Sequence, residues 1–352
     1  MGNLEMRTMK KTFAEIMFAG LLLTSCYGDY TMDYEYSGVY AAYQYDLRTF
    51  VIGEGMKFDF TVALGGVVEN TRDRKVRVVV DPDLLTCDLS TFSATGTAKS
   101  FTALDGLKGK AGLGTLSQSY VSKEMAAVSQ ISPLPVSCYS LEGLENLTIK
   151  KGRHTAAVTI RANENLLEDE KAFTPYFAIG FRIEDADADV VVKEKSFEVI
   201  AVKCENRFWG NWIHGGRTIV RNDVTSEIIS TSEYEADPAQ TDDKLYVLST
   251  LDAASVVTNT MQGRDGKLKL TFKGNDIEIS SYGQDFTINP IQGWPSRFND
   301  APLLQDRELT LNYCYSNGDG TTTYVYDILK FRNRIRDGIN EWQDENTENY
   351  EK

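Results

Sequence analysis

Apolar and polar residues alternate along most of the chain, which is the pattern of β-strands with one buried face. Residues 58–64 and 177–183 each carry an apolar side chain at every second position. The same alternation recurs at residues 76–80, 156–160, 268–272, 309–315 and 324–328. Turns rich in glycine, asparagine and aspartate separate these segments, as at 65–66, 274–276 and 317–320. Short strands at this spacing predict antiparallel β-structure.

The pattern also predicts how the chain is divided. The one short helix that we expect lies at 117–128, inside an insertion at 86–135 that is rich in glycine, serine and threonine. A strand at 197–202 ends the first unit, and roughly eight strands follow from Trp212, enough to close a barrel. We therefore expect an all-β protein with an antiparallel β-sandwich at 35–203, an antiparallel β-barrel at 206–335 and a frayed, charged tail at 336–352.

Composition narrows the classes of partner. The 352 residues are 42% hydrophobic and 25% charged, as in folded globular proteins, and the formal net charge is −14. Nucleic acids and anionic lipid surfaces require the opposite sign of charge, so we exclude them as partners. Histidine occurs only at positions 154 and 214, which argues against a multi-histidine metal site, and His214 is expected to line the barrel.

The amino terminus has the features of an export signal. A basic start at 9–11 precedes an apolar run at 13–23 that is too short to span a bilayer and contains a glutamate. The following Leu22-Leu23-Thr24-Ser25-Cys26 resembles the lipobox of bacterial lipoproteins. That resemblance implies a signal peptide at 1–25, acylation of Cys26 and a lipidated tether at 26–34. The alternative is an ordinary signal followed by a buried free cysteine.

Four further cysteines remain, at positions 87, 138, 204 and 314. Cys87 and Cys138 flank one insertion and are candidates for a disulfide across its base; otherwise we expect buried thiols.

The order of several motifs resembles a known family. Gly38-Val39-Tyr40, residues 65–70, Leu134-Pro135 and residues 147–152 follow the lipobox in that order. This is similar to the N-terminal immunoglobulin-like domain of unknown function in Bacteroidota surface lipoproteins of polysaccharide-utilisation loci. The resemblance implies an immunoglobulin-like sandwich over about 30–202 and glycan capture beside a SusC/SusD-like importer. It supplies no binding residues to transfer.

A second resemblance concerns the start of the other unit. Gly210-Asn211-Trp212 is similar to the G-x-W signature of lipocalin-like barrels. It implies that Trp212 plugs the base of the barrel and that Arg332 or Arg334, near the end of the last strand, packs on its ring as a cation–π contact. That role is structural and does not imply a lipid ligand.

Catalytic and metal-binding motifs are missing from the sequence. It has no G-x-S-x-G, H-E-x-x-H or P-loop, and the aspartates at 185–189 lack the glycine and glutamate of an EF-hand. Carboxylate pairs are abundant, but composition cannot identify a hydrolytic pair among so many acidic residues. We therefore predict no enzymatic activity, no cofactor and no metal ligands.

The best candidate for a sugar-binding site is a proline-containing loop at 293–300. It places Trp294 and Phe298, which can stack on sugar rings, beside Arg297, Asn299 and Asp300, which can bond hydroxyl groups. Tyr282 is expected nearby. The alternative is that Trp294 caps the hydrophobic core of the barrel, since tryptophan is usually largely buried.

These features predict a non-catalytic, lipid-anchored glycan-binding protein of the outer membrane, exposed at the cell surface. Its expected partners are a polysaccharide or oligosaccharide and a SusC/SusD-like importer, and it meets the membrane through its lipid anchor. One alternative is a structural or adhesive lipoprotein with a protein partner. Two others are a hydrolase and a barrel that encloses a small hydrophobic ligand.

Overall fold

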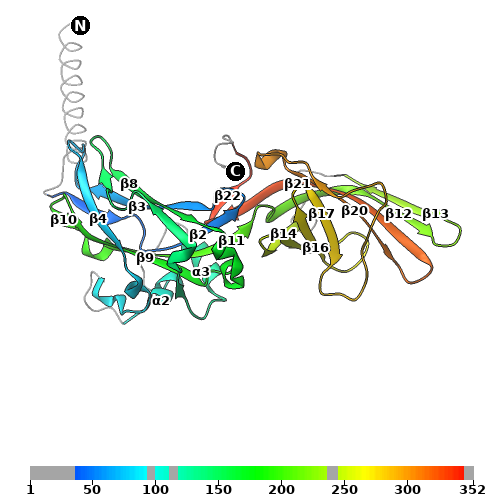
Figure 1. Cartoon of the computed structure of the whole chain (residues 1–352), viewed down its shortest axis with the longest axis horizontal. Coiled ribbons are helices and arrows are strands. Elements are labelled where there is room, and N and C mark those ends of the chain that lie inside the picture. Colours follow the sequence, from blue (N-terminus) through cyan, green and yellow to red (C-terminus); the bar gives the residue numbers. More distant parts are fainter. Residues whose placement is uncertain (1–35, 93–99, 111–117, 236–244, 345–352) are drawn as a thin grey trace, which may run out of the picture.

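The computed structural model describes residues 36–92, 100–110, 118–235 and 245–344. The predicted signal peptide, Cys26, the tether and residues 345–352 of the predicted tail lie outside this part of the chain. The prediction of an all-β protein is confirmed: strands form two units that lie end to end along the long axis of the molecule (Figure 1). Every helix within the described ranges is too short or too polar to cross a membrane.

The first unit is a sandwich of two sheets. One sheet contains, in spatial order, β10 (Val190–Val191), β1 (Gly38–Ala41), β3 (Lys57–Gly65), β8 (Thr155–Ala162) and β6 (Tyr139–Glu142). The other contains β2 (Tyr45–Ile52), β11 (Phe197–Asn206), β9 (Phe177–Ala186), β4 (Arg74–Val80) and β7 (Thr148–Ile149), with β5 (Ser132–Pro133) beside β9. The alternation seen in the sequence explains the core, because Phe60 of β3 stacks on Phe181 of β9 at 4.5 Å across the two sheets.

A helical layer covers the outer face of the second sheet. It contains α2 (Ala103–Leu107), α3 (Gln118–Met125) and the 3-10 helices η1 (Pro82–Leu85) and η2 (Leu89–Phe92). All ten side chains of β11 are buried, since this strand has packed neighbours on both faces. Gly106 of α2 is required here, because a Cβ atom would lie 2.1 Å from the Tyr45 ring. The described residues also form the 3-10 helices η3 (Val136–Cys138), η4 (Glu164–Glu168), η5 (Glu170–Phe173), η6 (Lys193–Lys195) and η8 (Leu304–Asp306).

This layering decides whether Cys87 and Cys138 can form a disulfide. Cys87 packs with the helical layer, whereas Cys138 lies in the core between the sheets, so the second sheet separates them. The proposed Cys87–Cys138 disulfide is therefore not formed, and all four cysteines of the described residues are free thiols.

The second unit is a curled sheet whose pairings return to their start. The ring of paired strands runs through β12 (Gly210–Asn222), β14 (Tyr246–Asp252), β15 (Ser255–Thr258), β16 (Leu268–Lys273), β17 (Asp276–Ser281), β19 (Arg297–Phe298), β20 (Glu308–Ser316) and β21 (Thr321–Arg336). β12 pairs with both β14 and β21, which closes the ring. β13 (Ile228–Tyr234) pairs with the outer half of β12 and prolongs the sheet beyond the barrel (Figure 1).

Large side chains fill the barrel. Trp212 is fully buried, its indole N–H donates to the Phe208 carbonyl at 3.0 Å, and its ring meets Phe331 edge-on at 5.5 Å. Tyr246 and Tyr313 are also fully or almost fully buried in the same core. This packing does not favour a small ligand inside the barrel.

Of the two predicted partners of Trp212, Arg334 contacts a different tryptophan. The Arg334 guanidinium lies over the ring of Trp209, 4.9 Å from its centre. In the β12–β21 pairing Trp212 lies opposite Phe331 and Asn211 opposite Asn333, so Arg332 is the extra residue of a β-bulge. The bulge resets the alternation of β21 and turns Arg334 inward, whereas Arg332 is half-buried.

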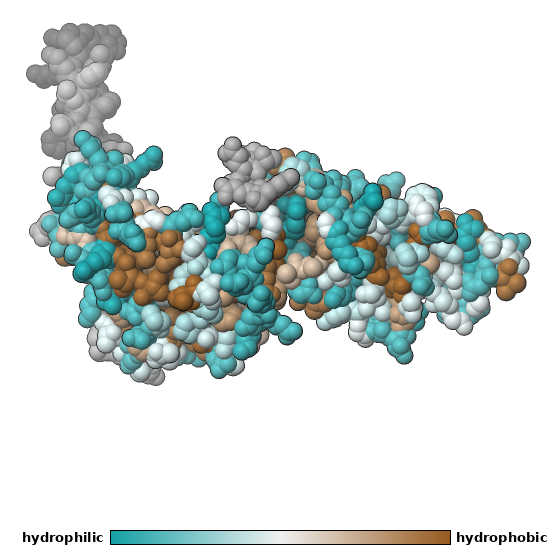
Figure 2. All heavy atoms as spheres, in the orientation of Figure 1, coloured by the Kyte–Doolittle hydropathy of each residue, from teal (hydrophilic) through white to brown (hydrophobic). Residues whose placement is uncertain are grey.

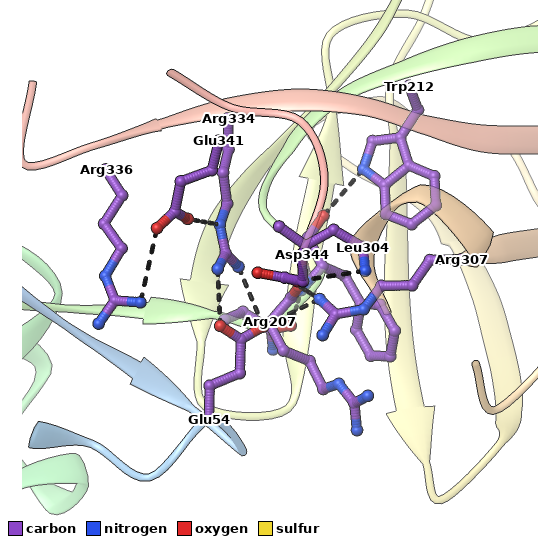
Figure 3. Close-up of polar contacts among 11 residues, drawn as sticks. Glu54, Arg207, Trp212, Leu304, Arg307, Arg334, Arg336, Glu341 and Asp344 are labelled. Carbon is purple, nitrogen blue, oxygen red and sulfur yellow. Dashed lines mark hydrogen bonds and ion pairs between the residues drawn. The ribbon is translucent and has the colours of Figure 1, made fainter. Parts of the chain in front are cut away.

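Arg334 also joins the two units. Glu54, in the turn between β2 and β3, accepts hydrogen bonds from Arg334 at 2.6 and 3.1 Å and from Arg307 at 2.9 Å (Figure 3). All three side chains are at most 1% exposed. Burial opposes ionisation of this carboxyl, yet Arg334 and Arg307 hold the pKa of Glu54 below its ordinary value. The units are thus joined by a buried, charged contact.

The described part of the predicted tail is ordered at this junction rather than frayed. After Arg336 the chain turns back as β22 (Ile339–Glu341), which pairs with β21. Glu341 accepts a hydrogen bond from Arg334 at 2.6 Å, and the backbone N–H of Leu304 donates to Asp344 at 3.3 Å (Figure 3). The charges that suggested a solvated tail are instead used as ion-pair partners.

Candidate functional site

Trp294 stands between two hollows on the outer wall of the barrel. The first, about 750 Å³, is lined by residues of β12, β13, β20 and β21, among them Arg217, Glu233 and Tyr326. The second, about 800 Å³, is lined by residues of β16, β17 and the loop that carries Trp294, among them Asp276 and Arg297. Both hollows include Trp294 and Asn312. We call the two together the Trp294 groove.

The topology explains why the loop projects. β18 (Asn289–Pro290) and β19 both pair with β20, so residues 291–296 bulge out between two pieces of one edge. The backbone N–H of Trp294 donates to the Ile291 carbonyl at 3.0 Å and closes a tight turn. Gly293 holds the third position of this turn with φ of +81°, which glycine adopts without strain. The turn presents the indole to solvent.

Hydrogen bonds fasten the loop to β20. The backbone N–H of Asn312 donates to the Ser296 hydroxyl at 2.8 Å, and that hydroxyl donates to the Asn312 carbonyl at 3.2 Å. The Asn312 side-chain amide donates to the Pro295 carbonyl at 2.9 Å. Ser296 and Asn312 are both buried, so the loop is held firmly on either side of Trp294.

The Trp294 ring is half exposed, at 50%, and does not cap the core. Its neighbour is Tyr326, whose ring it meets edge-on at 5.3 Å. Along β21 Val325 and Leu329 face the barrel core, which places Tyr326 on the outer face. The Arg217 guanidinium lies 4.9 Å from the Tyr326 ring centre and extends this aromatic surface.

The structure separates the other predicted sugar-binding residues. Arg297 lines the second hollow and pairs with Asp276 at 3.0 Å. Phe298 points the opposite way: it is 3% exposed and meets Phe208 edge-on at 4.9 Å in the core. Because successive strand residues face opposite sides, Phe298 cannot share the groove with Arg297 and is removed from the candidate site.

Asn299, Asp300 and Tyr282 are not among the residues that line either hollow. The Asn299 side chain bonds to the backbone of Ala301, Asp306 and Glu308, and so shapes a turn. Asp300 occupies the left-handed region in that turn, with φ of +58°. Tyr282 is exposed at the end of β17.

Several residues of the groove were not predicted from the sequence. Tyr326, Arg217 and Asn312 come from three different strands, and alternation alone indicates only that they face outward. Their proximity depends on the register of β12, β20 and β21, for example Arg217 opposite Tyr326. No local motif carries that information.

A buried polar cluster lies on the inner face of the same strands. Asp327 is fully buried and accepts hydrogen bonds from the hydroxyls of Tyr234 and, at 3.3 Å, Tyr246. His214 Nε2 lies 3.2 Å from the same carboxylate. Burial raises the pKa of Tyr234, so its hydroxyl keeps the proton that it donates. We assign this cluster a structural role, since it fastens the end of β13 to the barrel.

Metal binding finds no support in the described ranges, where no three His, Cys, Asp or Glu side chains are grouped to hold an ion.

Several solved structures of Bacteroides proteins align with this chain. A Bacteroides ovatus protein of unknown function aligns with a TM-score of 0.59 at 17% identity, covering 89% of this chain and 99% of its own. A multidomain protein including DUF1735 from B. ovatus has a TM-score of 0.39 at 11% identity, covering 88% and 100%. An auxiliary nutrient binding protein from Bacteroides thetaiotaomicron has a TM-score of 0.39 at 12% identity, covering 84% and 96%.

The first of these similarities shows a shared fold. No family model matches the chain, and no curated protein matches it.

Proposed function

We propose that this protein is a non-catalytic surface lipoprotein that binds a glycan in the Trp294 groove. The observation that carries the proposal is a half-exposed tryptophan, held by a fastened loop between two hollows. The face of an indole packs well on the apolar C–H face of a sugar ring, and the polar side chains beside it can bond hydroxyl groups. Because the loop is already held in place, binding costs little conformational entropy.

The state of the carboxylates in the second hollow supports binding rather than hydrolysis. In the second hollow Asp276 pairs with Arg297 at 3.0 Å and Glu278 with Lys273 at 2.6 Å. Both carboxylates are exposed. A glycosidase requires one carboxyl that holds its proton at neutral pH, usually through burial in an apolar site. Incubation with polysaccharides should therefore release no products.

The anchor belongs to the same proposal. Cys26 carries acyl chains, and the sandwich spaces the barrel from the outer membrane, beside a SusC/SusD-like importer. In support, β10, which pairs with the start of β1, lies at the end of the sandwich remote from the barrel (Figure 1). Labelled palmitate should enter the wild-type protein in cells and not the Cys26→Ala variant. Equal labelling of both would overturn the anchor alone.

Calorimetric titration against a panel of polysaccharides tests the binding proposal. We expect Trp294→Ala to weaken binding roughly thirtyfold, as for a central aromatic contact worth about 2 kcal/mol. Trp342→Ala is the matched control, because Trp342 is similarly exposed, at 55%, and is not among the residues that line the groove. Absence of heat with every glycan, or equal binding by the two variants, would contradict the proposal.

One observation favours the alternative of a protein partner. β13 lies at the end of its sheet, and Ile228 and Ile229 on it are more than half exposed. Hydrophobic atoms are visible at the tip of this hairpin, at the right end of Figure 2. An edge of this kind can accept a strand from another protein. Loss of co-purification with the importer in an Ile228→Lys, Ile229→Lys variant would support this role.

A further inference from the structure

The charges of the Trp294 groove suggest which class of glycan it takes. Resting on the proposed function, we infer that the groove binds an uncharged polysaccharide and holds an internal stretch of its chain rather than an end.

Each cation that lines the groove has a carboxylate beside or opposite it. Arg297 pairs with Asp276 at 3.0 Å. Arg217 lies opposite Glu233 in the β12–β13 pairing, and its guanidinium rests on Tyr326. Lys330 lies opposite Glu308 in the β20–β21 pairing. Directly opposite side chains on one face are about 5 Å apart, close enough for opposite charges to offset each other.

The balance of charge disfavours acidic glycans. The two hollows are lined by three cations and by the carboxylates of Glu233, Glu235, Asp276 and Glu278. The whole chain carries a formal net charge of −14. A sulfated or uronic-acid polymer would bring like charge to this surface, which is unfavourable. Hydroxyl groups, in contrast, can donate to paired carboxylates and accept from paired cations.

The position of Trp294 indicates the binding of an internal stretch. The two hollows lie on either side of the indole and share Trp294 and Asn312, and neither is enclosed. A sugar ring stacked on Trp294 therefore has room for further sugars in both directions. A site for a chain end would instead be closed on one side.

The test compares matched ligands. We would titrate the protein with soluble starch and with β-glucan, and separately with the carboxymethyl derivative of each polymer. Every titration would be done at about 50 and about 500 mM NaCl. The uncharged member of at least one pair should bind with an affinity that changes less than about twofold with salt. Its carboxymethyl derivative should bind at least about tenfold more weakly at low salt.

A length series tests the second half of the inference. Oligosaccharides from two to six sugars of the bound polymer should gain at least about tenfold in affinity with length, because only the longer ones reach both hollows. Arg297→Ala should weaken binding of the neutral polymer by the same factor at about 50 and about 500 mM NaCl, because it removes hydrogen bonds to hydroxyl groups and no ion pair with the ligand.

The outcomes separate this inference from the proposed function. Binding could depend on Trp294 yet prefer the carboxymethyl polymer, fall steeply with salt and be lost in Arg297→Ala. That result would overturn the inference of an uncharged ligand and would keep the proposal of glycan binding. A disaccharide that binds as tightly as the polymer would overturn internal binding alone. Absence of any Trp294-dependent binding would remove the proposed function and this inference together.

Discussion

At the scale of single residues, Glu54 illustrates how one side chain can join two units. Its turn contains three residues with positive φ, Gly53, Gly55 and Met56, and it carries the carboxylate into contact with Arg307 and Arg334. A buried charge is tolerated only when it is paired, so each member of this cluster depends on the others.

We expect Glu54→Ala to lower the free energy of unfolding by about 3–5 kcal/mol, because it removes the carboxylate that two buried guanidinium groups share and leaves Arg334 paired with Glu341 alone. Glu69→Ala, at an exposed position of the same unit, should change it by less than about 0.5 kcal/mol. Denaturant unfolding followed by tryptophan fluorescence measures both. Equal stability of the two variants would show that the contacts of Glu54 with Arg307 and Arg334 do not stabilise the junction.

At the scale of elements, the loop between β18 and β19 acts as one unit with β20. Ser296 and Asn312 form the reciprocal hydrogen bonds that hold Trp294 away from the barrel wall. Both partners are buried, so water could not easily replace these hydrogen bonds if one partner were removed.

Ser296→Ala should therefore destabilise the protein by about 1–3 kcal/mol and weaken binding of the neutral polymer by about three- to tenfold, since the loop must then be ordered on binding. Ser232→Ala on the exposed strand β13 should leave both quantities unchanged. Thermal unfolding and calorimetry measure the two effects. Unaltered affinity in Ser296→Ala would show that the fastening of the loop does not matter for the site.

At the scale of the whole molecule, a second charged cluster links the sandwich to the β21–β22 turn. Arg48 of β2 pairs with Asp46 at 2.7 Å and with Asp337 of that turn at 3.7 Å. Burial raises the pKa of Asp46 to about 6, and burial also raises the pKa values of Glu198 and Asp337. Glu54 differs, because its arginine partners lower its pKa.

These opposite shifts predict a stability optimum at mildly acidic pH. The Asp46 carboxyl titrates near 4 in the unfolded chain and at about 6 in the fold, so the fold binds its proton more tightly and loses stability as pH rises through 6. Glu54 contributes stability above its unfolded pKa of about 4.3, and this contribution is lost as pH falls below it. The melting temperature should thus be higher near pH 5 than near pH 7.5.

Asp46→Asn should flatten the decline between pH 5 and 7.5, because it removes the group that releases its proton there. Asp185→Asn, at an exposed position of β9, should retain the wild-type profile. Differential scanning calorimetry across the pH range provides the measurement. An unchanged slope in Asp46→Asn would assign the pH dependence to other groups.

The sequence by itself determined the class of fold and much of the core. Alternation places Phe60 and Phe181 inward whatever the arrangement of the sheets, because the side chains of a strand alternate with period two. The short helix expected at 117–128 is found as α3. The sequence singled out Trp294 as either a sugar-binding or a core-capping residue, and the structure shows that it is exposed.

Only the tertiary structure decided which distant residues meet. The bulge at Arg332 turns Arg334 toward Trp209 and Glu54, and the charges after Arg336 pair at the junction instead of fraying. Phe298 enters the core while Tyr326 joins Trp294 on the outer wall. Register, bulges and the docking of one unit on another depend on contacts between residues far apart in the chain, which local periodicity does not encode.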